Sequence, residues 1–503
     1  MMVGQLVAVI LLAPLAAVIG CVAFRRPRVA EFLNLAAAIA VFAAVLRLLP
    51  LALGGPFTFW RRYLIVDPLG AWVLLSVASV YLLASIYAIG YMRHAGDERR
   101  RYRFYALFAG FALTTLAGPL MNSVGVYWIA IELTTLVSTF LVCFELSRES
   151  IEAAWKYIVV VSGGISLALL GIILYYWSGS LVLGPTYDLT WQTLREVAPR
   201  INPTIALMAF LLVLVGFGTK VGLAPMHTWL PDAHSEGPTP VSAMLSGALL
   251  NTAMIGIARF IQVSDAAGLG VLPRVVVVAI GAFSLFVAAL FIARQTGVKR
   301  LMAYSSVEHM GVMAIGLGFG GPLGIAGALY HMLNHSLNKS LMFFGAGNVM
   351  QVFNTKRIGR IRYVNSVVPV TGLLWIAGAV AITGAPPFGL FLSEVTILRA
   401  GFLGPNEWAV YVMLILLIVI FVGFLNHFRA MYFGANPRAD APLPHLPARR
   451  HISVWCLLPM WLALIPLLAL GLWWPSTLTH YFAVIAEQLS TPTLAASLTG
   501  GTP

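Results

Sequence analysis

The chain has 503 residues, of which 60% are hydrophobic and only 10% charged, and its mean hydropathy is +0.90. A soluble domain carries about 25% charged residues, so this composition excludes a water-soluble fold, a disordered chain and a secreted disulfide scaffold. The formal charge of +13 does not indicate nucleic-acid binding, because the basic residues lie in short segments between apolar runs. The composition predicts an all-α polytopic membrane protein that contacts the lipid bilayer.

Apolar stretches define the expected helices, since about 20 such residues are needed to cross the hydrocarbon core. The first stretch is too long, and too directly followed by another, for a cleaved signal peptide, so we expect it to remain. Fourteen stretches are found in chain order: 3–24, 30–51, 68–92, 104–121, 123–144, 156–178, 204–222, 239–262, 271–293, 301–319, 323–350, 366–395, 407–431 and 453–474.

Basic residues in the loops predict the orientation. Of the 31 Lys and Arg residues, 21 lie in odd-numbered loops and eight in or beside even-numbered loops. Arg259 and Arg274 are among those eight. We therefore expect the odd-numbered loops on the cytoplasmic side of a bacterial-type inner membrane, with both termini on the other side.

Two spans contain helix-breaking residues around a charge. Lys220 lies between Gly216 and Pro225, and Glu394 follows Gly384 and Pro387. Interrupted spans in corresponding halves are typical of inverted-repeat transporters. The sequence predicts an N-terminal three-helix segment, two inverted five-helix repeats that each contain a broken helix, and a final helix with a short tail: 1–103, 104–262, 271–431 and 432–503.

Ionisable residues inside the expected spans are candidates for function because each is costly to bury in lipid. They are Glu132, Lys220, Glu308, His309 and Glu394. Two alternatives stay open: Glu132 could be an inter-helix hydrogen-bonding group, and His309 could pair with Glu308 or cap its neighbour.

A polar stripe marks the span over 323–350. Residues at positions i, i+3, i+4, i+7 and i+8 fall on one face of a helix, which is the reverse of a lipid-facing surface. Histidine titrates near neutral pH, so side chains and intervening waters on this face can pass protons. The stripe consists of His331, Asn334, His335, Asn338 and Lys339.

A second group of ligand-type residues lies near the first break. Prolines scatter them over what we expect to be a turn, which disfavours a metal site. We expect no metal or other cofactor in this chain, because Cys21, Cys143 and Cys456 also form no ligand pair. The group near the break consists of His227, Asp232, His234 and Glu236.

The segment KVGLAPMHTWLPDAHSEGPTPVSAMLSG resembles the signature of antiporter-like subunits of respiratory complex I, Mrp-type cation/proton antiporters and membrane-bound hydrogenases. Within that group, AYSSVEHMGVMAIGLGFGGPLGIAGALYHMLNHSLNKSLMFF is similar to the F-type subunits of hydrogenase-4 and formate hydrogenlyase complexes. Complex I subunits usually carry Ser-Gln where this chain has Glu308-His309. We also expect no long lateral helix of the kind found in the distal complex I subunit.

The resemblance implies a role for each matching residue. Glu132 matches the key glutamate of the family, and Lys220 matches the lysine with which it pairs. The central relay of span eleven is matched by Lys339 with His331 and His335. The terminal acidic residue of span twelve is matched by Glu394.

The chain departs from the family pattern on span eight. The segment LLNTAMIG places Asn251 where M-type subunits have a bridging lysine. Asn does not titrate in the working range, so the resemblance implies that water or another group joins Lys220 to the span-eleven relay.

The function expected from the resemblance is proton translocation within a redox-driven complex, most closely of hydrogenase-4 type, with the redox centres in partner subunits. Two alternatives are an Mrp-type or NADH dehydrogenase-type subunit and the membrane subunit of an inorganic-carbon uptake complex. A structural anchor with unused charges is a third alternative.

Overall fold

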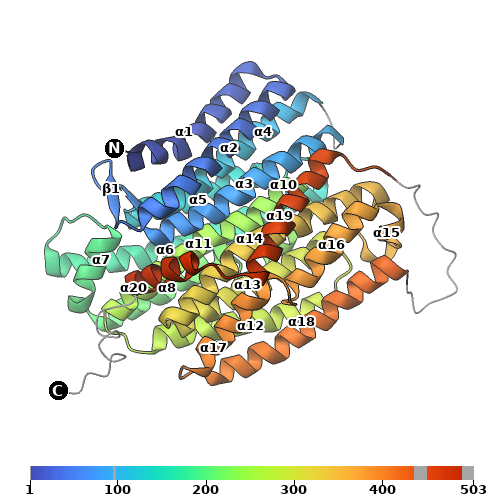
Figure 1. Cartoon of the computed structure of the whole chain (residues 1–503). Helices are drawn as coiled ribbons and strands as arrows, with labels where there is room; N and C mark the ends of the chain where they lie inside the picture. The colour runs from blue at the N-terminus through green and yellow to red at the C-terminus, as the bar shows by residue number, and fades with distance from the viewer. Residues whose placement is uncertain (1, 95–97, 435–449, 490–503) are drawn as a thin grey trace.

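The computed structural model describes residues 2–94, 98–434 and 450–489, and Figure 1 shows the helices lying side by side in one bundle. The antiparallel strands β1 (Phe57–Phe59) and β2 (Leu64–Val66) form a small hairpin in which Phe57 pairs with Val66. The α-helices of the described part are α1 (Met2–Phe24), α2 (Pro27–Ala52), α3 (Pro68–His94), α4 (Glu98–Ala117), α5 (Val124–Val142), α6 (Arg148–Leu183), α7 (Trp191–Val197), α8 (Pro203–Val221), α9 (Trp229–Glu236), α10 (Thr239–Met244), α11 (Leu250–Ala266), α12 (Leu272–Ile292), α13 (Val298–Phe319), α14 (Gly321–Phe353), α15 (Val364–Val367), α16 (Pro369–Ile382), α17 (Gly389–Phe402), α18 (Glu407–Phe433), α19 (Val454–Leu472) and α20 (Ser476–Leu489).

Each of the fourteen expected stretches coincides with a helix or with a helix that is interrupted. In the described part of the chain, ten helices are long and apolar enough to cross a membrane by length and composition. The other spans, α4, α13, α14 and the pair α16/α17, carry more polar residues or are broken. The predicted all-α, multi-pass fold is confirmed. Two basic residues counted in the last odd-numbered loop, Arg438 and Arg449, lie outside the described residues.

Burial separates central helices from peripheral ones. The apolar windows of α3 and of α10–α11 are almost wholly buried, whereas only 28% of each window is buried in α1, α18 and α19. Helix α14 lies in the centre, where it packs against α3, α13, α16, α17 and α19. The polar stripe of α14 is therefore enclosed by protein, and the apolar faces of the outer helices meet lipid.

The first break follows from the residues at the ends of α8. Asn202 begins the helix by accepting hydrogen bonds from the backbone amides of Thr204 and Ile205, at 2.9 and 3.3 Å. Gly222 ends it with a left-handed conformation, φ +81°. After a seven-residue interval, 222–228, the span resumes as α9. Lys220 lies in the last turn of α8, where the helix dipole favours a cation.

The second break lies between α16 and α17, at 383–388. Gly384 has a positive φ of +66° there, and Glu394 lies in the second turn of α17. Both predicted interruptions are present, each in the fourth span of its set. The inverted relation of the two sets remains a prediction.

The span predicted as continuous over 239–262 contains an irregular turn. Residues Leu245–Leu249 form a π-helical turn between α10 and α11. Such turns are rare and often lie at functional sites. This one ends two residues before Asn251.

Candidate functional site

Lys220 is fully buried, and its ammonium is held by two hydroxyls. Nζ donates hydrogen bonds to Thr135 Oγ1 at 2.8 Å and to Tyr157 Oη at 3.0 Å. The ammonium also lies 5.3 Å from the centre of the Tyr157 ring, within cation–π range. These partners come from α5 and α6, which places the charge between three helices.

Glu132 lies one turn before Thr135 on α5. Its carboxylate accepts hydrogen bonds from Ser162 Oγ at 2.6 Å and from Thr135 Oγ1 at 3.4 Å. Thr135 therefore donates to Glu132 and accepts from Lys220. The expected pair of charges is present as a three-membered chain in which a hydroxyl takes the middle position.

The hydroxyls around Lys220 were not singled out in the sequence. Thr135 could have been found, because it lies three residues after Glu132 on the same helix face. Tyr157 and Ser162 lie on another helix, and their spacing carries no signal. Tyr157 extends the group further, since its hydroxyl lies 2.8 Å from Ser138 Oγ.

Asn251 joins α11 to α14 in the centre of the bundle. Its amide nitrogen donates to Gly247 O at 2.9 Å and to Ser336 Oγ at 2.8 Å. Ser336 in turn donates to Gly247 O at 2.7 Å. In the described part of the chain, Asn251 Oδ1 is buried without a hydrogen-bond partner. A neutral, hydrogen-bonded group thus occupies the position between the two halves.

The polar stripe of α14 is buried throughout. Lys339 Nζ donates to Met302 O at 3.0 Å and to Ser305 Oγ, both on α13. Asn338 donates to Gly378 O at 3.0 Å on α16. All five residues of the stripe have no exposed surface: His331, Asn334, His335, Asn338 and Lys339.

Two imidazoles and a hydroxyl connect α13, α14 and α17. His309 Nδ1 lies 2.9 Å from His331 Nε2, and His331 Nδ1 lies 2.9 Å from Ser393 Oγ. Pairing of His309 with Glu308 was one of the open alternatives. In the structure His309 instead pairs with His331 of the stripe. A residue of α13 therefore belongs to the same group of side chains as Glu394.

Glu394 lies beside the second break and is 6% exposed. A Cβ added at Gly384 would overlap its carboxylate, so the break leaves room for this group. Several buried polar atoms near it have no hydrogen-bond partner among the described residues. Buried polar atoms of this kind are typically satisfied by water. They are Glu308 Oε2, His309 Nε2, His335 Nδ1, His335 Nε2 and Glu394 Oε1.

One group in the described part could supply cation ligands. His309, His331 and Glu394 each offer one ligand atom, and these atoms lie within 4.8 Å of one another. In this structure two of the imidazole nitrogens face each other at hydrogen-bonding distance. That arrangement suits transfer of a proton from ring to ring.

The ligand-type residues near the first break are placed differently from the prediction. The turn expected there is shorter, so Asp232, His234 and Glu236 lie on helix α9. His234 Nδ1 lies 2.8 Å from the backbone oxygen of Leu230, one turn earlier. His227 precedes the helix and is 8% exposed. These side chains have separate partners and do not converge on one centre.

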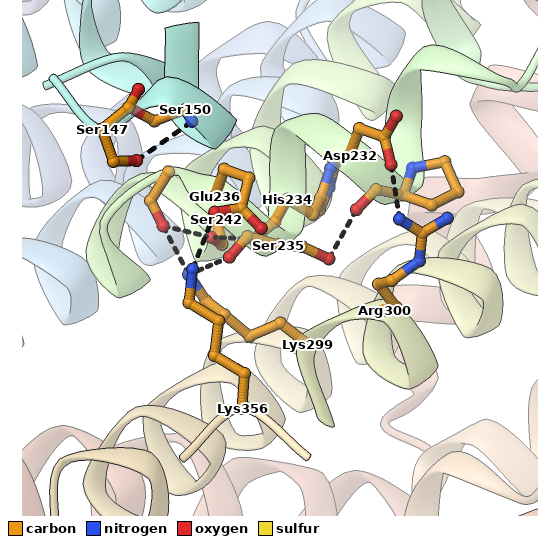
Figure 2. A network of polar contacts seen from close by, with 12 residues as sticks. Ser147, Ser150, Asp232, His234, Ser235, Glu236, Ser242, Lys299, Arg300 and Lys356 are labelled. Atoms are coloured by element: carbon orange, nitrogen blue, oxygen red, sulfur yellow. Dashed lines mark hydrogen bonds and ion pairs between the residues drawn. The ribbon is translucent and has the colours of Figure 1, made fainter. Parts of the chain in front are cut away.

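Two acidic residues of α9 bind the second half of the chain (Figure 2). Asp232 forms an ion pair with Arg300 at 2.5 Å, and Glu236 forms one with Lys356 at 2.7 Å. Lys156 of α6 lies 3.7 Å from Asp232. The half-helix after the first break is therefore tied to α13 and to the segment after α14.

Arg259, expected in or beside an even-numbered loop, lies in the C-terminal half of α11 and is 4% exposed. Its guanidinium pairs with Asp67 at 2.8 Å and lies over the Trp191 ring at 5.4 Å. Gln488 also donates to Asp67 at 2.8 Å. The pair lines a cavity of about 470 Å³ at the end of the bundle opposite α9.

Family models match two parts of the sequence. Residues 122–423 match the family described as NADH:quinone oxidoreductase/Mrp antiporter, TM. Residues 63–105 match the family described as NADH-Ubiquinone oxidoreductase (complex I), chain 5 N-terminus. The first match covers more than half of the chain. The chain belongs to this antiporter-like family.

Individual proteins agree with that assignment. A hydrogenase-4 component F homolog of Methylacidiphilum infernorum (isolate V4) is 36% identical over 350 residues, which cover 68% of this chain and 73% of that protein. A chain of the Mrp complex from Dietzia sp. DQ12-45-1b has a TM-score of 0.85 at 19% identity, covering 99% and 100% of the two chains. A chain of the archaeal membrane-bound sulfane sulfur reductase has a TM-score of 0.84 at 21% identity, covering 96% and 98%. At these identities the two solved structures show the fold alone.

The predicted resemblance is confirmed: the protein is an antiporter-like, multi-pass membrane subunit of the hydrogenase-4, complex I and Mrp family. Solved members of this fold belong to multi-subunit membrane complexes. The region from Glu132 to Glu394 lies within the longer family match, and Asp67 lies within the shorter one. The roles of the single residues remain predictions.

Proposed function

We propose that this subunit carries protons across the membrane within a redox-driven complex of hydrogenase-4 type. The observation that supports this most directly is the set of buried polar groups between Glu132 on α5 and Glu394 on α17. Ionisable groups inside a membrane protein are costly, and they pair with one another or with water in transport pathways.

The first part of the pathway is the chain Glu132–Thr135–Lys220. A hydroxyl accepts one hydrogen bond while donating another, so Thr135 can exchange its donor and acceptor roles. Protonation of Glu132 removes a negative charge near Lys220 and so disfavours the ammonium form. Protonation of one of these two groups therefore favours release of a proton from the other. This exchange sets the direction of proton transfer at the end of α8.

The centre of the pathway relies on neutral groups. Asn251 and Ser336 are hydrogen bonded to each other across α11 and α14. Asn251 does not titrate, so water must carry protons past it to Lys339. Its partnerless Oδ1 offers an acceptor to such a water.

The second part of the pathway runs from Lys339 along α14 to Glu394. His335 and His331 follow Lys339 at intervals of four residues, and His331 reaches Ser393 directly. Glu394 then takes or delivers the proton at the break between α16 and α17. Glu308 and His309 enlarge this part with two titratable groups from α13.

The redox chemistry is assigned to partner subunits. The relative from Methylacidiphilum is a hydrogenase-4 component F homolog, which supports a hydrogenase-type assembly. The chain would then lie in a bacterial-type inner membrane, with its odd-numbered loops in the cytoplasm. A cysteine replacing Gly359 should react with a membrane-impermeant maleimide from the cytoplasmic side. One replacing Leu403, in an even-numbered loop, should react from the other side.

Proton uptake in inverted vesicles containing the intact complex tests the proposal. Redox turnover and internal acidification are measured together for the wild type, Glu132→Gln and Lys220→Met. A matched control is Lys156→Met, because Lys156 is also on the cytoplasmic half but is about two-fifths exposed. We expect acidification to collapse in the first two variants while the control retains it.

Equal acidification in all variants at equal turnover would reject the proposal in favour of a structural anchor. Acidification that follows an imposed sodium gradient without any redox substrate would assign the subunit to the Mrp type. Genes for a large soluble zinc protein beside this one would favour the inorganic-carbon uptake alternative.

A further inference from the structure

A cavity of about 710 Å³ opens where several helices end on the side of α9, and the residues of the pathway do not line it. Its walls come from the C-terminal ends of α3 and α14, the segment after α5, the first turn of α4 and the beginning of α19.

Basic side chains dominate the polar part of the wall. Arg100 and Arg101 come from α4, Arg450 and His451 precede α19, and His94 ends α3. One carboxylate, that of Glu145, lies in the same wall. Among the described lining residues, three guanidinium groups thus accompany one carboxylate. Guanidinium groups form paired hydrogen bonds with phosphate, which makes them well suited to a phosphate ligand.

One buried nitrogen of Arg101, Nε, has no hydrogen-bond partner among the described residues. Leaving a buried donor of a charged group unpaired is costly. A phosphate oxygen in the cavity would satisfy it.

The remainder of the wall is apolar. Met92, Phe144, Val352 and Ile452 line the cavity beside the basic residues. Helix α19 begins at this wall and exposes apolar residues along its length, with Val454 72% exposed and Ile465 59% exposed. The cavity is thus next to a lipid-facing helix and combines an apolar part with a cationic part.

We propose that this cavity binds the phosphate headgroup of an anionic phospholipid. A free phosphate would use the arginines but leave the apolar wall bare. An anionic lipid satisfies both, because its acyl chains can lie along α19 while its headgroup meets the arginines. Basic pockets between transmembrane helices on the cytoplasmic side are known to bind such headgroups.

Binding is tested on the purified complex in detergent, with dioctanoyl phosphatidylglycerol as the probe and native mass spectrometry as the readout. Each basic residue near a membrane surface contributes about fivefold to anionic-lipid binding. The double variant Arg101→Gln/Arg450→Gln should therefore bind the probe about 25-fold more weakly. The double variant Arg101→Lys/Arg450→Lys keeps the charge but loses the paired hydrogen bonds of the guanidinium groups, so its affinity should lie between those of the wild type and the glutamine variant.

The control is Arg148→Gln/Arg294→Gln, which removes two exposed charges from the same side of the bundle outside the cavity. Three results would overturn the proposal. Unchanged binding in the Arg101→Gln/Arg450→Gln variant would show that the lipid binds elsewhere. Equal affinity for dioctanoyl phosphatidylcholine would show that the anionic charge is not recognised. Inorganic phosphate that displaces the probe at equal concentration would assign the cavity to a soluble anion.

Discussion

His309 Nδ1 lies 2.9 Å from His331 Nε2, so helices α13 and α14 exchange a hydrogen bond between two imidazoles in the middle of the bundle. Both rings are fully buried. Each can donate or accept, and the proton between them can belong to either ring. The contact therefore serves as a transfer step as well as a packing contact.

Replacing His309 with Leu should slow proton transfer through the second part of the pathway. The variant keeps an apolar side chain against α14 but removes the ring that can hold a proton. We expect redox-driven acidification to fall by about tenfold, the effect of roughly 1.4 kcal/mol on a barrier. His427→Leu is the control, because His427 binds the backbone oxygen of Ile292 outside the pathway. Equal losses in both variants would contradict a relay role for His309.

Replacing Thr135 with Val should separate Lys220 from Glu132. Valine has a similar shape but no hydroxyl, so it removes the middle member of the chain. Leaving Lys220 with one fewer partner should cost about 1–3 kcal/mol of stability. Thr135→Ser keeps the hydroxyl and should restore both stability and acidification. Thermal unfolding of the complex and vesicle acidification provide the two measurements, and normal acidification in the Val variant would exclude the hydroxyl link.

Replacing Gly384 with Ala tests the space beside Glu394. Alanine pays about 1–2 kcal/mol for the left-handed backbone conformation. It would also press on the Glu394 carboxylate, so acidification should fall together with stability. Gly359→Ala is the matched control, because a Cβ at Gly359 meets no atom within 4 Å. A loss of stability without any loss of acidification would show that the position of Glu394 is not limiting.

Replacing Arg259 with Met tests the buried pair with Asp67. Breaking a buried ion pair from one side leaves an uncompensated charge and costs about 3–5 kcal/mol. The double variant Asp67→Asn/Arg259→Met removes both charges and keeps an acceptor for the amide of Gly70, which Asp67 now binds at 2.8 Å. Its thermal stability should recover most of the loss, and a double variant as unstable as the single one would contradict the pairing.

The spans could be predicted because apolar length is a strong signal in membrane proteins. The broken helices were also predictable, since Gly222 and Gly384 both adopt the positive φ values that glycine permits. Helix α9 was missed because its eight residues contain two charged residues and a proline, a composition that is typical of a turn.

The candidate site could be predicted only in its charged members. Lys339 and His331 share one helix, so their spacing was visible in the sequence. The contacts of Lys220 with Tyr157 and of Asn251 with Ser336 join residues 63 and 85 positions apart. Local periodicity carries no information on such pairs, and neutral hydroxyls are common in helices of every kind.

The two halves of the chain meet at two places that differ in their sensitivity to salt. The ion pairs of Asp232 with Arg300 and of Glu236 with Lys356 are partly exposed, so dissolved salt screens the attraction within each pair. The screening length at physiological ionic strength is about 8 Å. The Asn251–Ser336 contact is neutral and buried, and salt leaves it unchanged. Raising the ionic strength should therefore weaken the contact between the two halves at the surface of α9 and leave their central contact intact. The two halves would then pivot about Asn251.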